Sequence, residues 1–222
     1  MPTSPEEKGF GQADPALARW AERVFAPEDA VLQEIRERSV REGLPAIAVG
    51  KFDGLHLEVL TRAAGARKAV EIGTLGGYSG VCILRGLGPQ GFLHTFEFEP
   101  HHARVAQESF EKAGVAAQAR IYLGAASARL HEIESEGPFD LCFIDADKTG
   151  YPAYLDWAGE HLRVGGLLLG DNAFGWGGVA KEGGEPGIEA IKRFNRELAV
   201  GGRFRATMIP TAEGLAMGVK VR

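Results

Sequence analysis

Oxygen-bearing side chains follow two apolar runs of the chain, at the point where each run ends. The run F-D-L-C-F-I leads into Asp145, and the run L-L-L-G leads into Asp171 and Asn172. Runs this short and apolar are typical of central parallel strands, whose carboxyl ends meet at the sheet edge where ligands bind. Two carboxylates and an amide at one such edge suit Mg²⁺, with Ca²⁺ or Mn²⁺ as alternatives. The simpler alternative is that each acid caps the helix after its strand.

The composition predicts a single soluble domain that binds a small molecule. The chain has 222 residues and is 45% hydrophobic, enough for one α/β core, so we expect one domain over residues 1–222. The formal net charge of −5, without a Lys/Arg-dense stretch, argues against nucleic acid or an anionic membrane as the main partner. No window approaches the ~18 apolar residues of a membrane span, and residues 1–14 are polar, so we expect a cytoplasmic protein.

Helical and strand patterns divide the chain into an annex and a core. We expect residues 1–15 to be flexible, residues 16–64 to form an N-terminal helical annex and residues 65–222 to form the core. Strands are predicted near residues 69–72, 93–98, 119–123, 141–144, 167–170, 204–209 and 215–220, and helices near residues 16–25, 28–41, 54–64, 78–87, 101–113, 127–135, 151–162 and 187–200.

This alternation predicts the fold class. Strands separated by helices imply right-handed crossovers and therefore a doubly wound, mainly parallel seven-stranded sheet. Only residues 210–214 join the last two strands, which is too short for a helical crossover, so the last strand should run antiparallel. The one long irregular segment, residues 173–186, is glycine-rich and follows Asn172 directly, which is typical of a mobile active-site loop.

A glycine-rich turn follows the first predicted strand, in the segment E-I-G-T-L-G-G-Y-S of residues 71–79. Its glycines let the backbone approach a ligand, and the next helix presents free N–H groups, although strand-to-helix geometry alone also explains the turn. The next strand ends at Glu97, about 20 residues beyond, where a carboxylate can accept hydrogen bonds from both hydroxyls of a ribose. Glu99 is explained more simply as an acid at the helix start. Turn and acid together favour a nucleoside cofactor.

These motifs resemble the class I S-adenosylmethionine-dependent methyltransferases, and among them the cation-dependent O-methyltransferases typified by catechol and caffeoyl-CoA O-methyltransferases. The resemblance runs from about residue 43 to the C-terminus and is carried by E-I-G-T-L-G-G-Y-S (71–79), E-F-E-P (97–100), F-I-D-A-D-K (143–148), G-D-N (170–172) and I-P-T-A-E-G-L (209–215). It implies a Rossmann-like methyltransferase fold, S-adenosylmethionine as cofactor, a small aromatic hydroxyl-bearing acceptor, and a homodimer to which the N-terminal helices contribute.

Carried over by position, the resemblance also implies residue roles. Asp145, Asp171 and Asn172 would ligate the metal, and the catalytic residues would be Lys148, as general base, and Asp145. The implied cofactor contacts are Val49, Glu71, Gly73, Leu75, Gly77, Ser79, Glu97, Phe98, Ala126, Asp145 and Tyr154. The chain departs from the family in two places: it reads Gly54-Leu55 where Gly-Gln is usual, and the loop after Asn172 lacks a clear match to the acid that holds a second catechol hydroxyl. Glu182 and Glu185 are the candidates for that role.

The implied chemistry explains these residue types. A phenol titrates at about 10, so a dication beside its oxygen favours the nucleophilic oxyanion. Lys148 would accept the hydroxyl proton; alternatively, it is an exposed lysine paired with Asp147. Phe174 and Trp176 are candidates for stacking on an aromatic acceptor, or for anchoring the loop to the core.

Two other functions remain open. A nicotinamide-dependent oxidoreductase would use the same sheet and ribose-binding acid, but its short-chain form needs Tyr-x-x-x-Lys, and no tyrosine of this chain has lysine four residues later. A non-catalytic protein that binds S-adenosylmethionine through an inherited pocket would not need three metal ligands and Lys148.

Overall fold

A computed structural model describes residues 15–222, in which one sheet forms the centre of the molecule. Its strands are β1 (Lys68–Ile72), β2 (Phe92–Glu97), β3 (Ala119–Leu123), β4 (Phe139–Ile144), β5 (Leu162–Gly170), β6 (Phe204–Ile209) and β7 (Leu215–Lys220), in the order β3-β2-β1-β4-β5-β7-β6. The strands pair in parallel except β7, which runs antiparallel to β5 and β6. The predicted fold class is confirmed.

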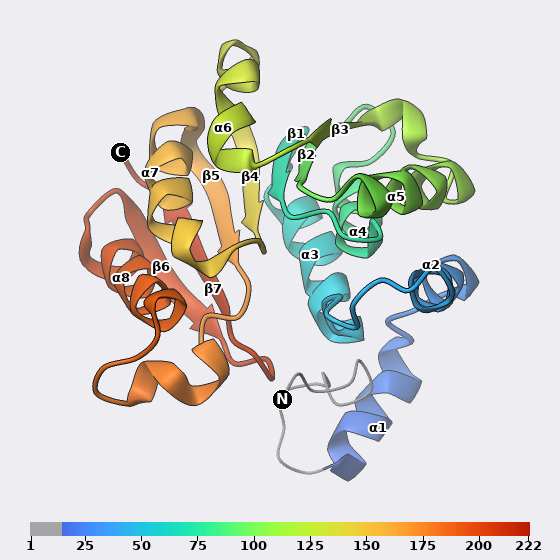
Figure 1. The fold of residues 1–222 in the computed structure, drawn as a ribbon, viewed down its shortest axis with the longest axis horizontal. Helices are drawn as coiled ribbons and strands as arrows, with labels where there is room; N and C mark the ends of the chain where they lie inside the picture. Colours follow the sequence, from blue (N-terminus) through green and yellow to red (C-terminus); the bar gives the residue numbers. More distant parts are fainter. Residues whose placement is uncertain (1–14) are drawn as a thin grey trace.

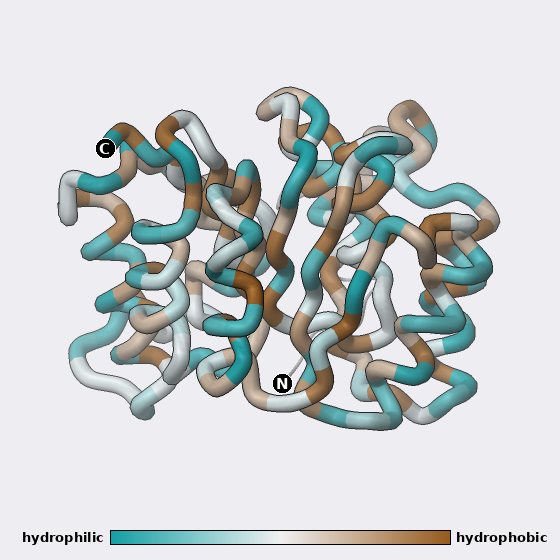
Figure 2. The backbone as a smooth tube through the Cα atoms, turned by 90° about the horizontal axis from the view of Figure 1, so that it is seen from above, coloured by the Kyte–Doolittle hydropathy of each residue, from teal (hydrophilic) through white to brown (hydrophobic). Residues whose placement is uncertain are grey.

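Helices cover both faces of this sheet (Figure 1). The α-helices of the described residues are α1 (Pro15–Phe25), α2 (Ala30–Arg41), α3 (Lys51–Ala63), α4 (Tyr78–Leu87), α5 (Pro100–Lys112), α6 (Ala126–Arg129), α7 (Tyr151–His161) and α8 (Pro186–Val200), of which α1 packs in neither of the apolar clusters on the sheet. One apolar cluster joins the sheet to α6, α7 and α8, and a second joins it to α2, α3, α4 and α5. Hydrophilic and hydrophobic segments alternate along the helices in Figure 2, as expected where one face packs on a sheet and the other meets water.

The strand order fixes where a ligand can bind. The chain builds outward from β1 to β3 and then returns to the other side of β1 with β4, so the direction of winding reverses between β1 and β4. At such a reversal the loops after the two strands diverge and leave a crevice at the carboxyl ends. Gly73 follows β1 and Asp145 follows β4, so both predicted motifs lie at this crevice.

Helix α3 begins at Lys51, three residues before the expected start at residue 54. Gly54 lies inside the helix, where the absence of a side chain serves packing. A Cβ at Gly54 would lie 2.8 Å from the Tyr78 ring, so the missing side chain lets α3 approach α4 closely. Strand β5 also begins earlier than expected, at Leu162, because the strand continues through Gly165 and Gly166. The predicted loop of residues 173–186 contains a short 3₁₀ segment, η4 (Gly175–Ala180).

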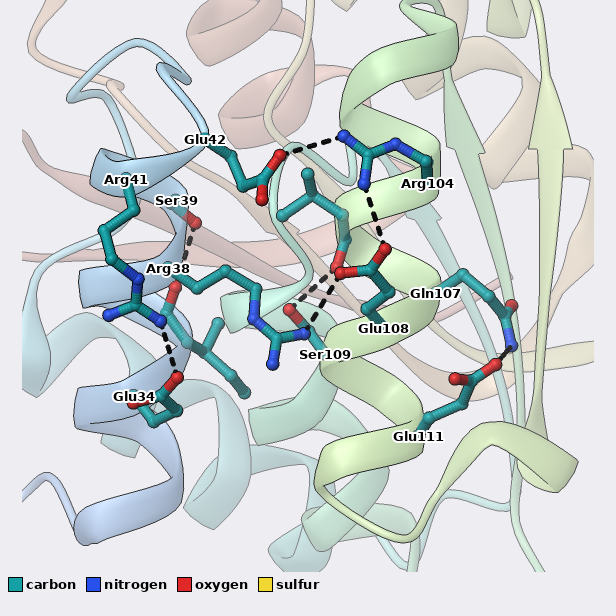
Figure 3. A network of polar contacts seen from close by, with 12 residues as sticks. Glu34, Arg38, Ser39, Arg41, Glu42, Arg104, Gln107, Glu108, Ser109 and Glu111 are labelled. Atoms are coloured by element: carbon teal, nitrogen blue, oxygen red, sulfur yellow. Dashed lines mark hydrogen bonds and ion pairs between the residues drawn. The ribbon is translucent and has the colours of Figure 1, made fainter.

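Ion pairs join the annex to the core between α2 and α5 (Figure 3). Arg104 contacts Glu42 at 2.9 Å and Glu108 at 3.0 Å, and Arg38 reaches Glu108 at 3.4 Å. Exposed pairs of this kind contribute only about 0–1 kcal/mol each, so they orient α2 more than they stabilise it. Of residues 1–15, for which we expected flexibility, residues 1–14 lie outside the described residues, and Pro15 is the first residue of α1. Within residues 15–222, every helix is too short or too polar to cross a bilayer.

We predict that Gly73→Ala destabilises the protein far more than Gly43→Ala. Both glycines have positive φ, +102° and +75°, but a Cβ at Gly73 would overlap the backbone carbonyl oxygen of Asp145, whereas a Cβ at Gly43 meets nothing within 4 Å. Urea unfolding should show a loss of about 3 kcal/mol or more for Gly73→Ala and about 1 kcal/mol for Gly43→Ala. Equal losses would show that β1 and β4 are not held this closely.

Candidate active site at the carboxyl edge of the sheet

A cavity of about 870 Å³ opens at the carboxyl ends of the central strands. Most of the predicted site residues line it, namely Val49, Gly73, Leu75, Ser79, Glu97, Phe98, Ala126, Asp145, Lys148, Tyr154 and Asn172. The remaining three, Glu71, Gly77 and Asp171, are buried and are not among the lining residues. Residues from the annex, including Val49 and Arg36, share this cavity with the core. The topology therefore brings together the segments that the sequence motifs singled out.

Backbone hydrogen bonds continue the sheet into the two acidic strand ends. The amide of Asp145 donates to Ile72 at 2.8 Å, and the amide of Asp171 donates to Ile144 at 3.0 Å. These bonds keep the ends of β1, β4 and β5 in step, so Asp145 and Asp171 lie next to each other at one edge. Neither acid occupies the N-cap of the helix that follows its strand. The capping alternative is therefore wrong for both.

Asp171 is a buried carboxylate that forms no ion pair with a described residue, although the charge of Lys148 acts on it. Its side chain is 3% exposed, and Oδ1 has no hydrogen-bond partner among the described residues. Burial raises the pKa of Asp171 well above its usual range, and the charges of Asp145 and Asp53 raise it further. Such a group is stabilised by a cation, because a positive charge offsets both the burial and the repulsion.

The donor set of this edge consists of two carboxylates and one amide. Asn172 has φ of 55° and donates from Nδ2 to Glu213 Oε2 at 2.5 Å, so its amide oxygen is available to another partner. No cluster of three or more His, Cys, Asp or Glu within residues 15–222 could hold a metal ion. A cation here would therefore depend on the amide oxygen as well as on Asp145 and Asp171, and this oxygen-only set fits a hard dication.

Lys148 pairs with Asp145 and not with Asp147, so the alternative pairing is wrong. Its Nζ donates to Asp145 Oδ1 at 3.0 Å and to the Tyr151 hydroxyl at 2.9 Å. Burial, followed by the nearby acids, raises the pKa of Tyr151 well above its usual range, so this hydroxyl stays protonated. Asp147 instead accepts a 2.6 Å hydrogen bond from Tyr154. Lys148 is thus held at the cavity wall by two partners.

The glycine turn surrounds a second buried acid, Glu71. This side chain is fully buried and accepts 2.6 Å hydrogen bonds from Ser79 and Thr95. Burial raises the pKa of Glu71 to about 8; the two hydroxyl donors oppose the rise, and the charges of Asp145 and Glu97 add to it. A cationic ligand group beside Glu71 would favour the ionised carboxylate.

Glu97 is fixed by backbone amides from the same turn. Its Oε2 accepts from Thr74 at 3.2 Å and from Leu75 at 2.7 Å, while Oε1 accepts from the amide of Glu99 at 3.0 Å. The adjacent Phe98 is 66% exposed at the cavity, an unusual position for a large apolar ring. Glu99 occupies the N-cap of α5, as expected, but its side chain makes no capping hydrogen bond.

Glu213 is a cavity residue that the sequence analysis missed. It lies in the turn between β6 and β7, is 8% exposed, and holds the Asn172 amide. The expected alternatives, Glu182 and Glu185, are exposed and do not line the cavity. Glu213 lies within the motif at residues 209–215. The short connection after β6 returns β7 alongside β5, and this pairing could have indicated that Glu213 lies near the end of β5.

Phe174 and Trp176 take different positions in the glycine-rich segment. Phe174 packs against Gly214, where a Cβ would lie 2.8 Å from the ring, so it anchors the segment to the core. Trp176 has a left-handed backbone (φ 51°), is 58% exposed and lines the cavity. Of the two aromatic residues, only Trp176 can therefore meet a ligand in this cavity.

Comparisons with known proteins agree with this arrangement. A family model described as "O-methyltransferase" matches residues 22–221. The chain is 36% identical over 200 residues to a catechol O-methyltransferase of Niastella koreensis, covering 86% of this chain and 90% of that protein. It is 36% identical over 197 residues to a catechol O-methyltransferase of Mycobacterium tuberculosis, covering 89% of each. A solved O-methyltransferase from Bacillus cereus, in complex with SAH, is 35% identical, with a TM-score of 0.87 over 92% of this chain and 97% of its own.

We predict that Glu71 makes the folded protein less stable as pH rises. Because the pKa of Glu71 is raised from 4.5 to about 8, the folded state binds more protons than the unfolded state between these values. The contribution of Glu71 to the unfolding free energy is therefore largest below pH 4.5. It decreases by up to about 1.4 kcal/mol per pH unit as the pH rises towards 8. Glu71→Gln should reduce the slope of the unfolding free energy measured in urea between pH 6 and pH 8.5.

The control is Glu160→Gln, which changes an exposed glutamate of α7 and should keep the wild-type slope. Some slope should persist in Glu71→Gln, since the raised pKa of Asp171 acts in the same direction. An unchanged slope in Glu71→Gln would contradict the assignment of a buried, largely protonated Glu71.

Proposed function

The chain belongs to the S-adenosylmethionine-dependent O-methyltransferase family, and from that premise we propose that it methylates a hydroxyl of a small catechol- or caffeoyl-like acceptor with the help of a divalent cation. The proposal rests on Asp145 and Asn172, which line the cavity beside Lys148, and on the buried Asp171, whose Oδ1 has no hydrogen-bond partner among the described residues. The family match argues against the two alternatives considered from the sequence, a nicotinamide-dependent oxidoreductase and a non-catalytic S-adenosylmethionine-binding protein.

We place the cofactor along the β1 and β2 edge of the cavity. Glu71 would meet the ammonium group of the methionine end, where its burial makes a cationic partner most favourable. Glu97 would accept from the ribose, and the exposed ring of Phe98 would stack on the adenine, as aromatic rings do. The further contacts we propose are Val49, Gly73, Leu75, Gly77, Ser79, Ala126, Asp145 and Tyr154. Because Val49 comes from the annex, we propose that annex and core act as one domain.

Asp145, Asp171 and Asn172 would hold the cation, for which Mg²⁺ is our first choice. When bound, the cation supplies positive charge that favours the ionised form of the acceptor hydroxyl. Glu213 would orient Asn172 by accepting its Nδ2 hydrogen, which aims the amide oxygen at the site. Its carboxylate also borders the cavity, where it can accept a hydrogen bond from a second acceptor hydroxyl.

Lys148 would take the proton of the acceptor hydroxyl. Its Nζ lies 3.0 Å from Asp145 Oδ1, and this contact holds the amine at the cavity, where the acceptor hydroxyl would lie. Ile47 is 51% exposed and lines the cavity together with Trp176, which gives the acceptor ring apolar walls. Fixed walls also help to align oxygen, methyl carbon and sulfur, and such alignment can supply up to about 7–11 kcal/mol of the barrier.

We predict that Asp171→Ala abolishes cation-dependent methyl transfer while leaving S-adenosylmethionine binding nearly intact. The variant removes one anionic ligand, so turnover of catechol with labelled cofactor and Mg²⁺ should fall by more than about 100-fold. EDTA should reduce wild-type turnover to a similar level. Calorimetry with Mn²⁺ gives a readout that is independent of activity, because the variant should lose Mn²⁺ binding.

Asp156→Ala is the matched control. Asp156 is an exposed acid of α7 that pairs with Arg203 and is not among the residues that line the cavity, so its loss should leave turnover and Mn²⁺ binding unchanged. Full turnover in Asp171→Ala, or wild-type turnover that resists EDTA, would refute the cation-dependent reaction.

We further propose a homodimer that buries the outer stripe of α1. Leu17, Trp20 and Val24 lie on one face of this helix and are about half exposed, as is Phe25. Large apolar residues gathered in this way mark an interaction surface more often than free surface. The proposed occupant is the same helix stripe of a second copy, since most soluble assemblies are symmetric homo-oligomers.

Analytical ultracentrifugation should therefore find a dimer at micromolar concentration, and Trp20→Glu should shift the protein to a monomer. Arg19→Glu introduces the same side chain on the opposite face of α1 and should leave the dimer intact. A monomeric wild-type protein, or a Trp20→Glu variant that stays dimeric, would contradict the proposed interface.

A further inference from the structure

A largely buried ion pair borders the annex side of the cavity. Arg36, in α2, donates from Nε to Glu28 Oε1 at 2.8 Å, and the two side chains are only 15% and 7% exposed. Glu28 precedes α2, and its Oε2 also lies 3.9 Å from the ammonium group of Lys51. A buried ion pair is weak evidence for stability, since apolar side chains of similar size often stabilise a protein as well. The pair at Arg36 therefore calls for an explanation beyond stability.

Arg36 reaches from this ion pair to a part of the cavity wall. Its Nη2 donates to the backbone oxygen of Val49 at 3.2 Å. Val49 belongs to residues 47–49, which line the cavity between α2 and α3 and lie outside any helix or strand. We call residues 47–49 the annex wall. Because such a segment lacks the repeating backbone hydrogen bonds of a helix or a sheet, contacts from side chains help to decide where it lies.

The same ion pair contacts the start of α4. The guanidinium of Arg36 lies over the Tyr78 ring, 4.3 Å from its centroid, and the Tyr78 hydroxyl donates to Glu28 Oε1 at 2.9 Å. Burial raises the pKa of Tyr78 well above its usual range, so this hydroxyl remains a donor. Tyr78 is the first residue of α4 and stands between Gly77 and Ser79 of the glycine turn. Arg36 thus connects the annex wall to the turn on which the proposed cofactor site is built.

We propose that Arg36 is a positioning residue that holds the annex wall in place for S-adenosylmethionine, and that Glu28 orients Arg36 for this role. A planar guanidinium offers donors in fixed directions, so Nε can engage Glu28 while Nη2 engages Val49. The third nitrogen, Nη1, is buried without a hydrogen-bond partner among the described residues, so the other two define the orientation of the group. The inference rests on the cofactor site proposed above: Arg36 acts through Val49 and Tyr78.

Calorimetry with S-adenosylhomocysteine, combined with thermal unfolding, tests this role. Arg36→Met keeps an unbranched apolar side chain but removes every donor, so affinity for S-adenosylhomocysteine should fall about tenfold. The variant should also unfold at a lower temperature, because it leaves the buried Glu28 carboxylate without its guanidinium partner. Adding Glu28→Gln removes that charge, so the double variant should recover most of the lost stability. Its affinity should stay about tenfold below that of the wild type, because Val49 is still not held.

Arg38→Met is the matched control. It removes a guanidinium from the same helix, but Arg38 pairs with Glu108 (Figure 3) and is not among the residues that line the cavity, so wild-type affinity should be retained. Should Arg36→Met fail to fold, the double variant carries the test by itself. Wild-type affinity in the double variant would show that Arg36 serves folding alone and would overturn the positioning role while leaving the cofactor site in place. Failure of the wild-type protein to bind S-adenosylhomocysteine would overturn the cofactor site itself.

Discussion

The repulsion between two carboxylates at one sheet edge, one of them buried, is the constraint on which the site depends. Asp171 and Asp145 follow neighbouring strands, and hydrogen bonds from their own amides to β4 and β1 prevent them from moving apart. Burial makes this arrangement costly, which is why the pKa of Asp171 is raised so far. A fold that keeps two acids in this position gains from a cationic partner, and Lys148 already offsets part of the charge at Asp145. The cation-dependent chemistry that we propose follows from this electrostatic need.

Glu71, further along the crevice, is also a buried acid that a cationic partner would stabilise. This acid lies behind the glycine turn, where Asp145 and Glu97 both add to the effect of burial on its pKa. Carboxyl groups are thus spread from the end of β1 to the end of β5, and a cationic ligand favours their ionised form. A cofactor with a cationic amino group and a cationic sulfur matches this field, whereas an anionic dinucleotide would meet repulsion. The electrostatics of the cavity therefore agree with the family to which the chain belongs.

The cavity depends on parts of the chain that are far apart in sequence. Val49 and Ile47 come from the annex, Glu97 and Phe98 from the end of β2, and Glu213 from the last turn of the sheet. Close approaches that only glycine permits hold these parts together, such as Gly54 against the Tyr78 ring. The ion pairs between α2 and α5 then fix the orientation of the annex, although each contributes little stability.

The sequence by itself determined the sheet and the position of its acids. Apolar runs that end in Asp145 and in Asp171 and Asn172 are central strands, and the carboxyl ends of parallel strands must share one edge. The pairing of Lys148 with Asp145, the use of Glu213 to hold Asn172, and the helical role of Gly54 were decided only by the tertiary structure. The physical reason is range: periodicity and strand ends are local properties of the chain, whereas partner choice depends on distances between side chains of separate elements. Those distances are set when helices and strands pack, and residue spacing along the sequence does not encode them directly.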